Sequence, residues 1–253
     1  MRINSIFRDW ASMARLPNVP TVWSNVFTAW VLAPWFPQAK EHWHGLIWIL
    51  AGGMFVYMGG AIFSEVCDVK FDRQFRPERP LPEGRVSRWM AGLAGIFFGV
   101  LGVGMMIAAP SDGRLALPMS AVLIVIVYSY AAFHKISPWF AVPLMALCRP
   151  MLVCIVLSLN MWLPPHYDDV FFTGPNGFGL AYMIALGLYV GGISWVALGE
   201  ARVWRRKAVG MMLACLPLLD AIFLVCGGHA MQLVVPLACM VLAIGLRKVA
   251  AAT

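Results

Sequence analysis

Charged residues are scarce in this 253-residue chain, and acidic residues are fewer than basic ones. Only 12% of the residues are Asp, Glu, Lys or Arg, whereas 61% are hydrophobic. A soluble globular domain contains about 25% charged residues, so this composition excludes an ordinary soluble protein and indicates a membrane protein. Because the chain holds only 12 acidic residues, any segment that gathers several of them needs an explanation.

Cysteine motifs and an N-terminal targeting signal are also missing. The six cysteines form no C-x-x-C pair, which excludes the usual zinc and redox motifs, and most lie in apolar segments where cysteine packs as a small apolar residue. Charged residues recur up to Arg15, before any apolar run begins, so a cleavable signal peptide is not expected. No long polar segment indicates an added soluble domain. We therefore expect residues 1–253 to form a single integral-membrane domain.

Long uncharged runs divide the chain into segments that can cross a bilayer, which takes roughly 20 mostly apolar residues. Runs without Asp, Glu, Lys or Arg cover residues 16–39, 42–64, 89–111, 115–134 and 170–199. Residues 136–167 contain one charged residue, Arg149, and residues 208–246 contain one, Asp220, with room for two spans around a turn at 226–229. The sequence predicts an all-α, polytopic membrane helix bundle of eight transmembrane helices, or nine if 136–167 is broken.

Basic residues are distributed unevenly between the two sides of this bundle. With both termini inside, the inner segments hold 16 of the 19 Lys and Arg residues, and the outer loops hold only Lys40 and Arg114. Positively charged residues favour the cytoplasmic side. We therefore predict that both termini are cytoplasmic and that the protein resides in a bacterial inner membrane. The net charge of +7 follows from this rule and does not indicate nucleic-acid binding.

One segment after the second apolar run is rich in both acids and bases. Ser64, Asp68 and Asp72 recur at every fourth position, so a helix that continues past the apolar run places them on one face. Crowded carboxylates need a cation, and Mg²⁺ takes oxygen ligands that it shares with substrate phosphates. Arg76 and Arg79 follow, and guanidinium groups bind phosphates well. The segment predicts a diphosphate site at a membrane face, and the alternative is a solvated cytoplasmic loop.

This segment resembles the first aspartate-rich motif of the UbiA superfamily of intramembrane aromatic prenyltransferases, N-D-x-x-D-x-x-x-D, and the R-P-x-R-P tail that follows it. Residues 64–72 read SEVCDVKFD, and residues 76–87 read RPERPLPEGRVS. The opening RLPN at residues 15–18, together with Asn25, is similar to the first helix of that family. The motif departs from the family at its start, where Ser64 and Glu65 replace Asn and Asp.

A second departure lies near the end of the fourth apolar run. The family's Y-x-x-x-K-R element is approximated by residues 130–135, which read YAAFHK, so that His134 takes the Lys position and Lys135 the Arg position. The resemblance implies that Glu65, Asp68 and Asp72 hold Mg²⁺, with the two aspartates catalytic. Diphosphate-binding residues implied in the same way are Asn25, Arg76, Arg79, Lys135 and Arg149.

The second half of the chain carries a reduced version of the acidic motif. Tyr57-Met58-Gly59-Gly60 recurs as Tyr189-Val190-Gly191-Gly192, and Glu200 follows Tyr189 at the same distance as Asp68 follows Tyr57. Ala197 and Trp204 stand where the first half has Glu65 and Asp72. By the resemblance, Glu200 is expected to be a catalytic residue, either as the opposing metal ligand or as the base that activates the acceptor. The chain is therefore expected to be a divergent member with an incomplete second acidic motif.

Arg149 is unusual because a charge near the bilayer centre costs several kcal/mol unless it faces the bundle interior and finds an anion. It is expected either to bind diphosphate, to pair with Glu65 or Glu200, or to form a salt bridge between helices. Asp220 is expected to be a buried polar contact in the seventh helix.

The resemblance implies an enzyme that transfers a prenyl group from an isoprenyl diphosphate to a small acceptor within the membrane, with Mg²⁺-assisted ionisation of the diphosphate. An aromatic acid, a quinone precursor and a polyol are all open as acceptors. The alternative is a non-catalytic carrier or transporter of a lipid or prenylated product on the same fold, which the reduced second motif favours. A phosphatidyltransferase of the CDP-alcohol type is disfavoured because no D-G-x-x-A-R element precedes Asp68.

Overall fold

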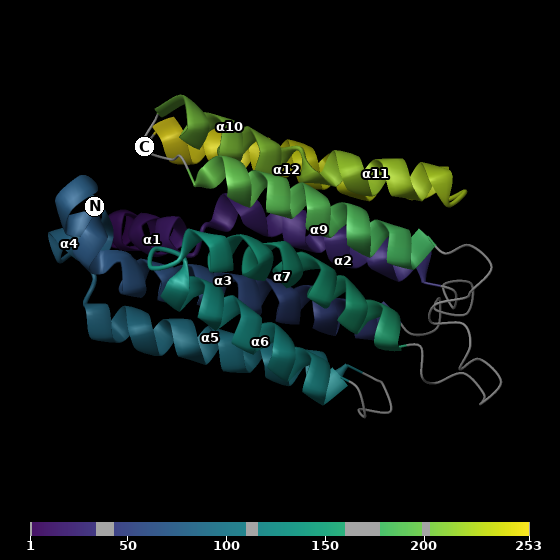
Figure 1. Cartoon of the computed structure of the whole chain (residues 1–253), viewed down its shortest axis with the longest axis horizontal. Helices are drawn as coiled ribbons and strands as arrows, with labels where there is room; N and C mark the ends of the chain where they lie inside the picture. Colours follow the sequence, from purple (N-terminus) through teal and green to yellow (C-terminus); the bar gives the residue numbers. More distant parts are fainter. Residues whose placement is uncertain (1, 34–42, 110–115, 160–177, 199–202, 253) are drawn as a thin grey trace.

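The computed structural model describes residues 2–33, 43–109, 116–159, 178–198 and 203–252. Within these ranges the regular elements are all helical. The α-helices are α1 (Arg2–Met13), α2 (Val19–Leu32), α3 (Trp43–Phe75), α4 (Pro80–Glu83), α5 (Arg88–Ala108), α6 (Ala116–Phe133), α7 (Pro138–Ser158), α9 (Phe178–Ala197), α10 (Val203–Ala214), α11 (Leu216–Cys226) and α12 (Val234–Ala252). The long helices lie side by side, and both termini are at the same end of the bundle (Figure 1).

Six helical stretches in the described parts of the chain are long and apolar enough to cross a membrane. They are Trp43–Phe75, Arg88–Ala108, Trp139–Leu157, Phe178–Ala197, Lys207–Cys226 and Ala230–Lys248, and Leu117–Phe133 is a shorter apolar helix. The protein is therefore an integral membrane helix bundle, as predicted. Helix α2 has 14 residues, which gives a length of only about 21 Å, so the predicted number of eight full spans stays a prediction.

The breaks between helices follow from proline and glycine. Helix α11 ends at Cys226, and Gly228 has a φ of 80°, a left-handed conformation that glycine adopts readily; this confirms the predicted turn at 226–229. Helix α7 is continuous over Pro138–Ser158 despite Pro143 and Pro150. The break considered for residues 136–167 therefore does not occur within this helix.

Helices α3 and α5 pack closely because glycines line their contact. A Cβ atom added to Gly59 would lie 2.7 Å from the carbonyl oxygen of Gly95, and one added to Gly102 would lie 2.6 Å from that of Gly52. Small residues of this kind let helix backbones approach within a membrane. The contact fixes the long helix α3, whose last turns carry the predicted acidic site.

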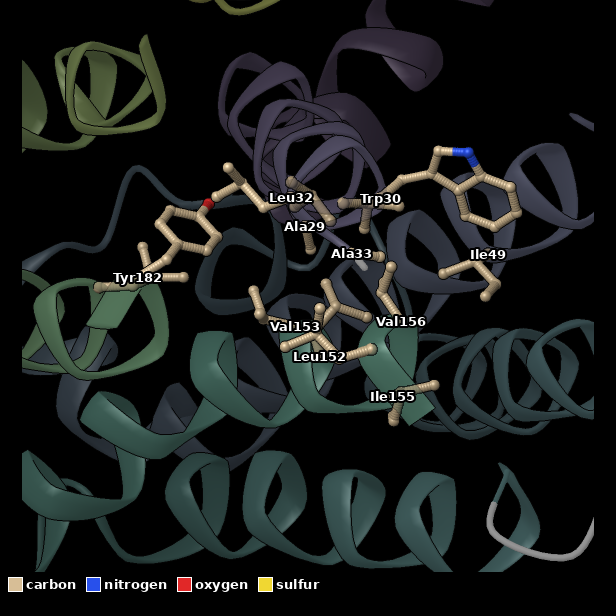
Figure 2. Close-up of a cluster of buried hydrophobic side chains, with 14 of the residues drawn as sticks. Ala29, Trp30, Leu32, Ala33, Ile49, Leu152, Val153, Ile155, Val156 and Tyr182 are labelled. Carbon is tan, nitrogen blue, oxygen red and sulfur yellow. The ribbon is translucent and has the colours of Figure 1, made fainter. Parts of the chain in front are cut away.

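The hydrophobic core occupies the end of the bundle away from the termini. It combines buried residues of α2, α3, α5, α6, α7, α9 and α11. The labelled side chains of Ala33, Ile49, Val156 and Tyr182 illustrate the part formed by the end of α2, the first turns of α3 and α9 and the last turns of α7 (Figure 2). At the terminal end a smaller apolar cluster, which includes Met13, Val69 and Leu81, joins α1, α3 and α4. This second cluster anchors the charged segment against the bundle.

Candidate functional site

The last turns of α3 form a carboxylate face at the terminal end of the bundle. Because α3 continues without interruption to Phe75, Ser64, Asp68 and Asp72 lie on one side, and all three are buried. Glu65, one position from Ser64, is buried as well. The predicted common face is therefore confirmed.

Arg79 bridges two carboxylates of this face. Its Nη1 atom lies 2.8 Å from Oε2 of Glu65 and 2.9 Å from Oδ2 of Asp72. Arg15 is a second cation beside Glu65, at 3.5 Å from Oε1. Hydrogen bonds between a guanidinium and a carboxylate are among the stronger ones in proteins, so Glu65 and Asp72 have their negative charge compensated within the protein.

The segment that carries Arg79 is folded against α3 and α1. Pro80 occupies the first position of α4, and Gly84 ends this short helix with a φ of 82°. Arg85 donates to Asp9 of α1 with a distance of 2.9 Å. A proline at the first helical position and a glycine at the end are the residues that such a turn requires. The R-P-x-R-P tail therefore builds a fixed support for the Arg79 side chain.

Asp68 has a different partner from its neighbours. Its Oδ2 atom lies 3.1 Å from Nε2 of His134, whose Nδ1 atom lies 3.1 Å from the carbonyl oxygen of Ala131. The ring of Tyr130 stacks on the His134 ring with centroids 5.1 Å apart. His134 is thus oriented from two sides, and it links the end of α6 to the carboxylate face of α3.

A cavity of about 550 Å³ opens beside Asp68. Its lining residues are Arg15, Asp68, Phe71, Phe75, Arg76, Tyr130, His134, Lys135, Ala141, Val142, Ser194, Ala197 and Leu198. Basic side chains dominate the charged part of this lining, and Asp68 is the one carboxylate among the lining residues that the structure describes. The remaining wall is aromatic and aliphatic, which suits a ligand with an anionic head and an apolar tail.

The structure divides the predicted site residues into two groups around this cavity. Asp68, Arg76 and Lys135 line it, whereas Glu65, Asp72 and Arg79 are not among its lining residues. The Nζ atom of Lys135 lies 4.7 Å from the centre of the Phe71 ring, a cation–π contact that holds the ammonium group at the cavity wall.

The carboxylate face can be tested for its fit to a divalent cation. In the described parts of the chain, no three His, Cys, Asp or Glu residues already converge as a metal cluster. The Oδ1 atom of Asp72 is nevertheless buried without a hydrogen-bond partner, and carboxylate oxygens are the ligands that Mg²⁺ prefers. The residues therefore fit a hard dication in donor chemistry, although Arg79 lies between two of the donors.

Asn25 and Arg149 are not among the residues that line this cavity, and their role in diphosphate binding stays a prediction. Arg149 donates from Nη1 to Oδ1 of Asn25 at 2.6 Å and from Nη2 to Oγ1 of Thr21 at 3.0 Å. Neither Glu65 nor another carboxylate accepts a hydrogen bond from Arg149 among the described residues. Its partners are instead neutral groups of α2, inside the bundle.

Asp220 completes this buried polar network, which agrees with the expectation that it makes a buried polar contact. It accepts hydrogen bonds from Nδ2 of Asn25 at 3.0 and 3.1 Å, from Tyr182 at 2.7 Å, and from Ser24. The amide of Asn25 therefore connects Arg149 with Asp220 and ties α2 to α7 and α11. This arrangement explains how the charge of Arg149 is accommodated in a membrane helix.

Several site residues were missed from the sequence, and one predicted residue lies outside the described ones. Arg15 and Ser194 line the cavity, and neither was assigned a role; the place of Arg15 as the first residue of the RLPN resemblance was the available signal. Glu200 belongs to residues 199–202, which lie outside the described residues. Leu198, two positions before it, lines the cavity, so the end of α9 faces the end of α3 across this space.

Comparisons with known proteins agree with this architecture. The sequence profile of the UbiA prenyltransferase family matches residues 22–252. A curated relative, the digeranylgeranylglyceryl phosphate synthase of Sulfolobus acidocaldarius, is 36% identical over 77 residues, which are 30% of this chain and 27% of the relative. The match thus spans about a quarter of that relative's length.

A solved structure supports the same fold. It is described as giving structural and mechanistic insights into the biosynthesis of digeranylgeranylglyceryl phosphate synthase in membranes, and it superposes with a TM-score of 0.60 over 94% of this chain and 85% of that chain. At 15% identity this likeness concerns the fold alone. The family profile extends over nearly the whole length and includes the acidic end of α3, and the chain therefore belongs to the UbiA prenyltransferase family.

Proposed function

We propose that this protein transfers a prenyl group from an isoprenyl diphosphate to a small acceptor at the membrane surface. The observation that carries the proposal is the cavity beside Asp68, which combines Arg15, Arg76 and Lys135 with an apolar wall. A diphosphate head needs several cations, and a prenyl tail needs apolar surface. Family membership supports prenyl transfer in general.

In the proposed reaction, the bond between C1 of the prenyl group and the diphosphate oxygen breaks, and both electrons leave with the diphosphate. Arg15, Arg76 and Lys135 bind the diphosphate and stabilise the charge that develops on it. The nucleophilic atom of the acceptor forms a new bond to C1 and releases a proton. The side chains of Phe71 and Phe75 give the prenyl chain an apolar surface near the reacting carbon.

The proposal includes Mg²⁺ at the carboxylate face, with Asp68 and Asp72 as its ligands. Glu65 and Glu200 are the further ligands that we propose from the sequence. When bound, Mg²⁺ would neutralise part of the diphosphate charge. Asp68 belongs to the carboxylate face and also lines the cavity. A metal ion bound to Asp68 would therefore lie next to the diphosphate of the proposed substrate. His134 holds this carboxylate in place.

The proposal predicts that Asp68→Asn reduces kcat/KM for prenyl transfer by about 100-fold or more, the size expected when a group that stabilises transition-state charge is lost. The measurement is release of diphosphate by purified protein in lipid nanodiscs with geranylgeranyl or farnesyl diphosphate. The acceptor panel should contain an aromatic acid, a quinone precursor and a prenylated glyceryl phosphate, the last because of the relative's name.

Glu78→Gln is the matched control, because Glu78 is an exposed carboxylate of the same charged segment. It should retain activity within about twofold, since surface substitutions have small effects. Equal activity in Asp68→Asn and the control would contradict the assignment of Asp68. Binding of prenyl diphosphate without turnover of any acceptor would instead favour the carrier function on this fold.

A further inference from the structure

Arg79 lies between two of the carboxylates that are proposed as metal ligands, Glu65 and Asp72. A single nitrogen atom, Nη1, contacts one oxygen of Glu65 and one of Asp72, at 2.8 and 2.9 Å. These two acids are seven positions apart on α3, two helical turns, and Asp68 lies between them. The guanidinium therefore spans the same face whose donor chemistry fits a divalent cation.

The position of Arg79 is built into the fold. Its backbone carbonyl accepts from the amide of Glu83 at 3.0 Å, and its amide donates to the carbonyl of Arg76 at 3.2 Å. The following residue, Pro80, is buried and begins α4. A side chain on such a fixed backbone loses less conformational entropy on pairing than one on a mobile loop, so the contact with the two carboxylates is strong.

The guanidinium and a divalent cation cannot occupy this position together. Mg²⁺ holds its ligands at about 2.0–2.1 Å, which is closer than the 2.8 and 2.9 Å contacts of Arg79. The two oxygens would have to move toward a metal, and the Nη1 atom would have to leave. The Oδ1 atom of Asp72, buried without a partner, is the donor that Arg79 does not satisfy.

We propose that Arg79 is a built-in counter-ion that holds Glu65 and Asp72 in the metal-free protein and competes there with a divalent cation. The inference rests on the metal part of the proposed function. It gives Arg79 a role at the carboxylates, in place of the direct diphosphate contact that the sequence predicted. A divalent cation held by Glu65 and Asp72 would displace the Arg79 guanidinium, so occupancy of the site would depend on the metal concentration.

The test measures Mn²⁺ binding to purified protein without substrate. The electron paramagnetic resonance signal of the free ion reports how much Mn²⁺ remains unbound. Arg79→Gln should bind Mn²⁺ about tenfold more tightly than the original protein, because removal of an opposite charge beside two carboxylates favours a competing cation. Arg79→Lys keeps the charge but loses the planar fork, and it should lie between the two. This milder variant also serves if Arg79→Gln does not fold.

Arg73→Gln is the matched control for net charge. Arg73 is exposed and adjacent to Asp72 in sequence, so the substitution removes the same charge without removing the bridge. It should change Mn²⁺ affinity by less than about threefold, because exposed charges are screened by solvent and salt. Equal affinities in Arg79→Gln and Arg73→Gln would overturn the inference, as would weaker binding in Arg79→Gln.

A second readout separates this inference from the proposed function. Without metal, Arg79→Gln should unfold at a lower temperature than Arg73→Gln. Saturating Mn²⁺ should raise the unfolding temperature of Arg79→Gln by more than that of Arg73→Gln, because a ligand stabilises the state that binds it. A variant with Glu65→Gln, Asp68→Asn and Asp72→Asn defines background binding. Binding at background level in every protein would overturn this inference and the metal part of the proposed function, whereas carboxylate-dependent binding that is unaffected by Arg79→Gln would overturn only this inference.

Discussion

Asn25 illustrates how one neutral side chain can make two buried charges compatible with a membrane helix. Its Oδ1 atom accepts from Arg149, and its Nδ2 atom donates to Asp220. An amide offers both an acceptor and two donors, so it satisfies a cation on one side and an anion on the other. An Asn25→Leu substitution would remove this hydrogen-bond partner from both ions. The loss of stability would be large, because a buried charge without a hydrogen-bond partner is costly.

At the residue scale we predict that Arg149→Met destabilises the protein by about 3 kcal/mol, the size expected when one member of a buried charged network is removed. Oδ1 of Asn25 and Oγ1 of Thr21 would lose their donor, and Asp220 would lose the attraction of the nearby cation. Denaturation in mixed micelles, followed by circular dichroism, measures the loss. Arg149→Met combined with Asp220→Asn should cost less than the sum of the single changes, since the groups share a network.

Arg88→Met is the control for this comparison, because Arg88 is exposed at the start of α5 and carries the same charge. Its effect should stay within about 0.5 kcal/mol. If Arg149→Met unfolds at the same denaturant concentration as Arg88→Met, the network does not stabilise the bundle. Additive effects of Arg149→Met and Asp220→Asn would contradict the coupling between them.

The contact between helices α3 and α5 depends on the absence of side chains. Gly59→Ala and Gly102→Ala would each place a Cβ atom within 2.7 Å of backbone atoms of the facing helix, and backbone cannot move aside as the end of a flexible side chain can. We predict that each substitution costs about 2 kcal/mol, within the range for overpacking. Thermal unfolding of the detergent-solubilised protein, read by size-exclusion chromatography after heating, measures this.

Gly104→Ala is the internal control on the same helix. A Cβ atom at Gly104 has no atom within 4 Å among the described neighbours, and alanine is favoured over glycine in a helix by about 1 kcal/mol. This variant should therefore be as stable as the original or more so. A similar loss in all three variants would indicate a general cost of alanine at these positions and not a close helix contact.

The length of the uncharged apolar runs predicted most of the helices, because a bilayer requires apolar runs of a certain length. The uncharged run at 170–199 contains α9, and the run at 89–111 contains all of α5 except its first residue, Arg88. The run at 16–39 is also long enough to cross a bilayer, yet α2 begins only at Val19, after a 3-10 turn at Leu16–Asn18. Hydropathy does not report this start, which depends on Pro17 and Pro20 and on the local backbone.

Periodicity predicted the carboxylate face but not its partners. The spacing of Asp68 and Asp72 fixes their common side once α3 continues, because this is a property of one helix. The contact of His134 with Asp68 joins residues 66 positions apart, and that of Asn25 with Asp220 joins residues 195 apart. Such contacts depend on which helices become neighbours, and a single sequence does not encode this in any local pattern.

At the scale of the whole molecule, the two ends of the bundle differ in chemistry. Both termini and the charged segment around α4 lie at one end (Figure 1), and the cavity is lined by Asp68, Phe75 and Arg76 from the end of α3 and the residue after it. The turn after Cys226 lies at the opposite end of α11. An excess of basic residues on one side predicts the orientation in a membrane, so the asymmetry that predicts the topology also supplies the cations of the proposed diphosphate site.

This asymmetry predicts that the site faces the cytoplasm, which labelling of single cysteines can measure. Cys226 is exposed at the turn between α11 and α12, whereas Glu78 is exposed in the charged segment. In a background without the other cysteines, Cys226 should react with a membrane-impermeant maleimide in intact spheroplasts. A cysteine introduced as Glu78→Cys should react only after permeabilisation or in inverted vesicles. Labelling of Glu78→Cys but not Cys226 in intact spheroplasts would reverse the topology, and it would place diphosphate binding on the outer side of the membrane.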